Sequence, residues 1–194
     1  MEELRAQLKF KAIIIQCCTV KVMSLVQALC DIVCSKDGSL HGEPLGPSDP
    51  QRVAVITTNP DMLFASDHPS PRFGPRVVEL CLNSVYREKT GKDLIIEQYG
   101  KPHEANFRFV EEYLTSLATK RAIKISNFYM IGDNPESDIA GGNGVGWITI
   151  LVKSGVFKPT NHTSIDGNDK KNPATHVVEN FKEAIELIFR LENL

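Results

Sequence analysis

The chain has 194 residues, of which 42% are hydrophobic and 24% are charged, and its formal net charge is −2. This composition is typical of a folded globular protein and excludes a disordered chain. The near balance of 22 basic and 24 acidic residues excludes a broad basic surface for nucleic acid or an anionic membrane. No apolar run approaches the ~20 residues that span a bilayer, so we expect no membrane span.

Short apolar segments alternate with amphipathic stretches along the whole chain. In chain order, the predicted strands are residues 10–17, 53–58, 94–96, 128–131, 148–152 and 176–178. The predicted helices lie between them and at the end, at residues 22–33, 75–85, 107–117, 137–143 and 181–188. This alternation predicts the α/β class, with a parallel sheet covered on both faces.

The cysteines and the N-terminal segment bear on where the protein resides. The five cysteines include no CxxC pair, which favours reduced thiols. The N-terminal segment carries two glutamates and no cleavable apolar stretch, so no secretory signal is visible. We therefore expect an intracellular protein.

Polar residues follow the predicted strand at 128–131, where parallel sheets place their chemistry. Asp133 and Asp138 lie five residues apart at the start of a short helix. Two carboxylates at this spacing can converge on one Mg²⁺ ion, which prefers oxygen ligands. Alternatively, Asp133 and Ser137 cap the helix while Asp138 is solvated. Spacing alone leaves both interpretations open.

Two other features have ordinary structural explanations. The glycine-rich segment at residues 141–146 ends a helix and leads into a strand, whereas a dinucleotide-binding fingerprint follows a strand and opens a helix. We therefore interpret these glycines as a helix cap and a tight turn. Lys101 follows a predicted strand, and a lone lysine there is usually a solvated surface charge.

Three segments together resemble motifs three and four of the haloacid dehalogenase (HAD) superfamily, at residues 100–102, 132–141 and 150–155. Residues 58–61 are similar to the cap signature of its subfamily IIA. Further segments resemble the cat eye syndrome critical region protein 5 family, at residues 57–74, 90–92 and 173–178. The resemblance implies an α/β cap domain at residues 1–93 and the C-terminal part of a Rossmann-like core, with a partial parallel sheet, at 94–194.

The resemblance also implies roles for individual residues. Lys101 would be the catalytic lysine that balances charge on the nucleophile and the phosphoryl oxygens. Asp133 would be a magnesium ligand, with Asp138 as a second-shell or water-mediated partner and Asn134 beside them. Complete relatives would hydrolyse a small phosphorylated metabolite through an aspartyl phosphate.

Two cap residues, Asn59 and Asp61, would lie near the substrate entrance. The resemblance further suggests mitochondria and a link to glycerophospholipid metabolism.

The superfamily's Asp-x-Asp nucleophile motif occurs nowhere in the 194 residues. Its nearest imitation, Ser35 to Ser39, has serine at the nucleophile position and follows a helical pattern. We therefore expect a chain that begins inside the cap, as a truncated isoform or fragment, with weak or absent Mg²⁺ binding and no activity alone. The strand at 128–131 would then have an unpaired apolar edge, which predicts marginal stability and self-association.

Three functions are compatible with these observations. The first is the C-terminal portion of a magnesium-dependent phosphatase-like hydrolase. The second is a non-catalytic binding or regulatory protein that uses the cap surface, pairs with a full-length relative, and is cytoplasmic if the short chain is the mature form. The third is a receiver-like or nucleotide-binding module. It is disfavoured because the first strand ends in Gln16, Cys17, Cys18 and Thr19, with no acidic residue among them.

Overall fold

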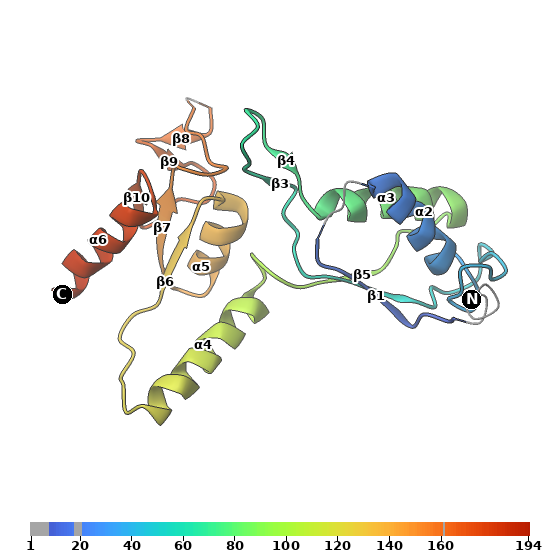
Figure 1. Cartoon of the computed structure of the whole chain (residues 1–194), viewed down its shortest axis with the longest axis horizontal. Helices are drawn as coiled ribbons and strands as arrows, with labels where there is room; N and C mark the ends of the chain where they lie inside the picture. Colours follow the sequence, from blue (N-terminus) through green and yellow to red (C-terminus); the bar gives the residue numbers. More distant parts are fainter. Residues whose placement is uncertain (1–7, 18–20, 161) are drawn as a thin grey trace. The chain divides into compact units, whose positions relative to one another are not determined.

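The computed structural model describes residues 8–17, 21–160 and 162–194, which form two compact units (Figure 1). The first unit contains the described residues up to Met62 together with Phe73–Tyr99. The second contains Leu63–Arg72 and Gly100–Leu194. The boundary predicted at residues 93 and 94 lies just before a strand that pairs within the first unit.

The first unit is a three-stranded parallel sheet with two helices (Figure 1). Its strands β1 (Ala12–Ile15), β2 (Ala54–Thr57) and β5 (Ile96–Gln98) are ordered β1-β2-β5. Helices α2 (Val22–Val33) and α3 (Arg76–Thr90) pack against each other beside the sheet. Strand β5 begins two residues later than the strand predicted at 94–96.

The core of this unit lies on one face of the sheet. In β1, Ile13 and Ile15 are buried, whereas Ile14 between them is 62% exposed. Leu82 and Tyr86 of α3 are almost fully buried against the covered face. The prediction of a sheet covered on both faces is therefore wrong for the described part of this unit. A run of three isoleucines is apolar on both faces, so it cannot indicate which face is covered.

The second unit is also built on a three-stranded parallel sheet, with the order β10-β7-β6. Its strands are β6 (Tyr129–Gly132), β7 (Ile148–Val152) and β10 (His176–Val178). Ile150 of the central strand β7 packs in one core cluster and Leu151 in another. This sheet is therefore covered on both faces, as the alternation of elements predicted, and the α/β fold class is confirmed.

Helices cover the two faces of this sheet (Figure 1). Helix α6 (Phe181–Glu192) packs Ala184 on the Ile150 face. The other face is covered by a π-helical turn, η1 (Pro135–Ile139), whose Ile139 is fully buried beside Leu151. Helix α5 (Ala140–Gly144) continues from this turn.

Helix α4 (Glu104–Lys120) contributes one buried residue, Phe107, to the described core. The Phe107 ring meets Trp147 edge to face, with ring centroids 5.5 Å apart, and Trp147 in turn stacks on Phe128 at 5.1 Å. No helix of the described residues is both long and apolar enough to cross a membrane.

Two small hairpins were not predicted from the sequence. The first joins β3 (Leu63–Phe64) to β4 (Arg72–Phe73), and the second joins β8 (Ser164–Ile165) to β9 (Asn168–Asp169). Each strand has only two residues, and most of the side chains are exposed. Such short strands produce no hydrophobic alternation that a sequence pattern could detect.

Truncation of Leu82 tests the core of the first unit. Leu82→Ala should lower the free energy of unfolding by about 2–5 kcal/mol, because the side chain is fully buried and its removal leaves a cavity. Leu80→Ala is the matched control on the same helix, since Leu80 is 41% exposed. Urea denaturation followed by circular dichroism measures both. Equal losses for the two variants would contradict this packing.

The Tyr129–Glu192 hydrogen bond, which joins β6 to α6, predicts a pH dependence of stability. The Tyr129 hydroxyl donates to Glu192, and this bond is the main cause that lowers the pKa of Glu192 and raises that of Tyr129 to about 12. A lowered carboxyl pKa stabilises the fold above the ordinary value of 4.5, and this contribution is lost as the pH falls through the folded-state value. The raised tyrosine pKa stabilises the fold below pH 10, and this contribution is lost as the pH rises toward 12.

The stability difference between the natural chain and Tyr129→Phe should therefore be largest at neutral pH and shrink toward both extremes. Urea unfolding followed by the fluorescence of Trp147, the single tryptophan, measures it in this unit. Tyr113→Phe is the control, since Tyr113 is 57% exposed on α4. A difference that does not change with pH would show that this hydrogen bond is not the cause.

Candidate functional site

The chain turns sharply where strand β6 ends. Gly132 is the last strand residue, and Asn134 caps the following π-helical turn by accepting a hydrogen bond from the Glu136 amide at 3.0 Å. Pro135 occupies the first position of the turn, where a missing N–H costs nothing. Single π-helical turns occur frequently at functional sites, so this segment is a structural candidate for one.

The Asp138 carboxylate folds back over the end of β6 and is 3% exposed. Its Oδ2 accepts hydrogen bonds from the backbone amides of Asp133 at 3.1 Å and Asn134 at 3.0 Å. Its Oδ1 lies 2.5 Å from the Lys101 ammonium. A buried carboxylate is tolerated only when it is paired and hydrogen-bonded, and these three donors meet that requirement.

Gly132 makes this arrangement sterically feasible. A Cβ atom at Gly132 would lie 2.2 Å from the Cβ of Asp138, well inside the contact distance of two carbons. Any side chain at position 132 would therefore force Asp138 away from the strand end. The glycine fixes where the buried carboxylate lies.

Asp133 is held by the loop that follows strand β7. Its Oδ2 accepts the Val156 amide at 2.7 Å, and its backbone carbonyl accepts the Phe157 amide at 3.0 Å. Gly155 permits the contact, because a Cβ there would lie 1.8 Å from the Asp133 Oδ2. Among the described residues, none donates a hydrogen bond to Oδ1. One oxygen of Asp133 is thus anchored and the other is available.

The structure brings four of the six predicted site residues together in the second unit. Lys101 and Asp138 form an ion pair, and Asp133 and Asn134 donate their backbone amides to the same carboxylate. The roles assigned to these residues stay predictions, but the alternative of a solvated Asp138 is wrong, because its carboxylate is buried and paired. Spacing along the sequence could not reveal this pairing, because Lys101 lies 37 residues from Asp138 and only the folded chain brings the two together.

Asn59 and Asp61, the other two predicted residues, belong to the first unit. The Asn59 side chain accepts the Asp61 amide at 3.0 Å, a local turn that holds the chain after β2. Their predicted place at a substrate entrance stays a prediction.

Sequence reasoning did not assign a role to the segment that anchors Asp133. Gly155 was recognised only as the end of a motif and Val156 was not singled out, although both follow the carboxyl end of β7, where a parallel sheet gathers its functional residues. Ser137 was considered only as a cap. Ser137 is part of the turn itself, and its hydroxyl is buried with no hydrogen-bond partner among the described residues.

The donors present suit a weakly held magnesium ion. Magnesium takes oxygen ligands and often uses one or two carboxylates together with water. Asp133 offers one carboxylate oxygen, whereas both oxygens of Asp138 already accept N–H donors. Within the described part of the chain, no three His, Cys, Asp or Glu side chains gather as a metal site. The arrangement fits a metal with a single protein carboxylate and leaves most ligands to come from elsewhere.

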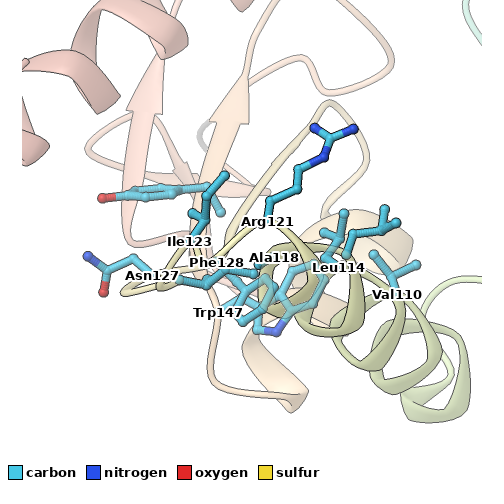
Figure 2. Close-up of a pocket in the computed structure, with 11 residues that line it drawn as sticks. Val110, Leu114, Ala118, Arg121, Ile123, Asn127, Phe128 and Trp147 are labelled. Atoms are coloured by element: carbon cyan, nitrogen blue, oxygen red, sulfur yellow. The ribbon is translucent and has the colours of Figure 1, made fainter.

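A hollow lies at the opposite end of β6 from the cluster of Lys101, Asp133 and Asp138, and its lining differs from that cluster. It has a volume of about 520 Å³ and is bounded by α4 and the segment that leads into β6 (Figure 2). Its labelled lining side chains are mainly apolar and include Val110, Leu114, Phe128 and Trp147. Arg121 is the one charged side chain among its lining residues, and the lining offers no carboxylate for a metal ion.

Comparison with known families supports a hydrolase. Residues 98–184 match the family model described as HAD-hydrolase-like. This range contains Lys101, Asp133 and Asp138, together with the loop after β7. The match and the parallel sheet with its chemistry at the carboxyl ends define a HAD-like hydrolase unit.

Two curated proteins are similar to this chain. One is a cardiolipin synthase (CMP-forming)/mitochondrial hydrolase fusion protein of Schizosaccharomyces pombe, 36% identical over 135 residues that make up 68% of this chain and 21% of the fusion protein. The other is a mitochondrial hydrolase of Saccharomyces cerevisiae, 27% identical over 152 residues, covering 68% of this chain and 43% of that protein. The chain thus spans less than half the length of either relative.

Solved structures show the same fold. A possible sugar phosphatase of the HAD superfamily from Cytophaga hutchinsonii superposes with a TM-score of 0.51 at 25% identity, covering 67% of this chain and 42% of that one. A p-nitrophenyl phosphatase from Archaeoglobus fulgidus superposes with a TM-score of 0.50 at 17% identity, over 91% and 56% of the two chains. Over residues 98–184 this chain is HAD-hydrolase-like in sequence, and these solved structures show that the fold agrees.

Removal of the Lys101 charge tests the ion pair. Lys101→Met should lower the free energy of unfolding of the second unit by about 1–2 kcal/mol, because Asp138 then stays buried without its cation. The loss is not larger because the Lys101 side chain is 38% exposed, so water partly screens the pair. Lys124→Met, at an exposed position of the same unit, is the control. Trp147 fluorescence during urea unfolding measures both. An unchanged Lys101→Met variant would show that the pair contributes nothing.

Proposed function

We propose that this chain is the C-terminal portion of a magnesium-dependent HAD phosphatase of subfamily IIA, related to the cat eye syndrome critical region protein 5 family. The observation that carries the proposal is the cluster of Lys101, Asp133 and Asp138 at the carboxyl end of β6. This cluster lies inside the segment that matches the family. The named functions of similar proteins, phosphatase and mitochondrial hydrolase, agree with it.

Each residue of the cluster has a distinct task. Asp133 would hold the metal through Oδ1 while Val156 fixes its other oxygen. Asp138 would not ligate directly; it orients the turn and holds Lys101 in place. Lys101 would direct positive charge at the phosphoryl oxygens of the substrate. Bound magnesium would neutralise charge that develops on those oxygens.

The 194 residues contain no Asp-x-Asp, so the cluster would need a nucleophile from a further segment. Phosphoryl transfer to an aspartate requires a carboxylate facing the phosphorus atom. Here Asp138 is held by three donors, and Asp133 is assigned to the metal. We therefore expect the chain alone to bind a small phosphorylated metabolite weakly and to leave it intact. A mitochondrial location is part of the proposal, since one curated relative is named a mitochondrial hydrolase and the other a fusion protein with a mitochondrial hydrolase.

A Mg²⁺ titration of the isotopically labelled chain, followed by amide NMR, tests the metal site. Mg²⁺ should shift the amides of residues 133–138 with a shallow, weak binding curve, and Asp133→Asn should abolish the shifts because it removes the anionic ligand. Asp166→Asn is the matched control: Asp166 is exposed with φ 51°, a left-handed conformation that asparagine also tolerates. Shifts that survive in Asp133→Asn would count against the assignment.

Intact mass and peptide mapping of the endogenous protein test the need for a further segment. Upstream peptides with an Asp-x-Asp motif would support a working phosphatase in which this cluster serves. A mature mass near 21.6 kDa would instead favour a non-catalytic binding protein. Turnover of p-nitrophenyl phosphate by the chain alone, lost in Asp133→Asn, would overturn the expectation that it is inactive.

A further inference from the structure

The apolar hollow at the start of β6 has the size of a ligand pocket (Figure 2). Its volume of about 520 Å³ falls within the ~300–1,000 Å³ typical of sites that take small molecules. It adjoins Phe128 and Tyr129, whereas the candidate metal and phosphate site lies at the carboxyl end of the same strand. A molecule bound in the hollow would therefore be distinct from the substrate of the proposed hydrolase.

The walls of the hollow offer apolar surface that is still in contact with water. Leu114 of α4 is 39% exposed, and Ile123 in the segment that leads into β6 is 57% exposed. Phe128 and Trp147 add two stacked rings whose centroids lie 5.1 Å apart. Apolar surface of this kind gains free energy when another apolar group displaces the water. The walls thus favour a ligand with an apolar body.

Arg121 supplies the charge of the lining. Figure 2 shows its side chain reaching away from the Phe128 and Trp147 rings, so the charge and the aromatic rings lie at different ends of the hollow. Among the described residues no carboxylate pairs with Arg121, whereas Arg108 of α4 pairs with two glutamates. A cation at a helix C-terminus also offsets the helix dipole, so it is the adjoining apolar hollow that points to a ligand.

Two other polar side chains of the lining are already engaged. Asn127 donates a hydrogen bond to Glu192 at 2.7 Å, and the Tyr129 hydroxyl donates to the same carboxylate. Their donors are therefore committed to holding the segment before β6 against α6. Arg121 is left as the group that can orient a ligand, and its guanidinium suits a carboxylate through two parallel N–H···O bonds.

We propose that this hollow binds an amphipathic carboxylate, a molecule with one apolar chain and one anionic head. The chain would lie along Leu114, Phe128 and Trp147, and the head would pair with Arg121. A cationic ligand would meet no carboxylate in the lining, and a fully polar ligand would lose its hydration against apolar walls. The proposal uses no residue of the candidate metal and phosphate site, so it stands or falls independently of the proposed function.

The fluorescence of Trp147 tests the proposal, because Trp147 is the single tryptophan of the chain and lines the hollow. Octanoate at neutral pH should change the emission along a saturable curve. Octanol, which has the same chain length and no charge, should bind about tenfold more weakly, since it lacks the charge-assisted contact with Arg121. Arg121→Gln should bind the two probes equally. Lys124→Gln, an exposed charge outside the lining, should keep the preference for octanoate.

A second pair of variants tests the apolar part of the hollow. Leu114→Glu places a carboxylate among the walls and should weaken octanoate binding at least about tenfold through repulsion and lost apolar contact. Thr115→Glu is the matched control, because it adds the same charge at the next position of α4, outside the lining. Far-UV circular dichroism of each variant checks that the fold is retained.

Amide NMR with octanoate locates the binding. Shifts at residues 110–128 that leave residues 133–138 unmoved would support the proposal. Shifts confined to other residues, or equal binding of octanoate and octanol by the natural chain, would overturn it. An emission change that accompanies dimer formation in sedimentation would assign the hollow to a second copy of the chain instead, and loss of the dichroism signal would show unfolding by the probe; either result also contradicts the proposal.

Discussion

The buried carboxylate of Asp138 is the constraint on which the second unit depends. It closes the chain over the end of β6, pairs with Lys101 and receives two backbone amides. Because an unpaired charge at that depth would be costly, the turn, the lysine and the strand end must adopt their positions together. The cluster therefore behaves as one structural element, and its chemistry follows from an arrangement that the fold already requires.

The same constraint extends to the neighbouring strand β7, because two glycines allow the backbone to approach the carboxylates closely. Gly132 admits Asp138, and Gly155 admits Asp133, so the loops after β6 and β7 interlock through two carboxylates. The carboxyl ends of adjacent parallel strands meet at one edge, which is why both loops contribute to the same site. Asp133 is thereby fixed through one oxygen while the other remains available to a cation.

Much of the fold was predictable because hydrophobic periodicity is local. The alternation of strands and helices placed all six long strands and all five helical regions within a few residues of their observed positions, and Asp133 and Asp138 were recognised as candidate site residues after the strand at 128–131. The two hairpins were not, because their strands have two residues each and mainly exposed side chains. Periodicity also failed at Ile13–Ile15, where an apolar run does not reveal that one face of the sheet is open.

The sequence by itself determined the α/β class, the order of the elements and the types of functional group that follow β6, since these depend on neighbours within a few positions. Only the tertiary structure decided that β5 pairs with β2, that Asp138 turns inward to Lys101 and that Val156 holds Asp133. These last contacts join residues 37 and 23 positions apart. Such pairings depend on strand order and on the room left by two glycines, and no local pattern encodes either.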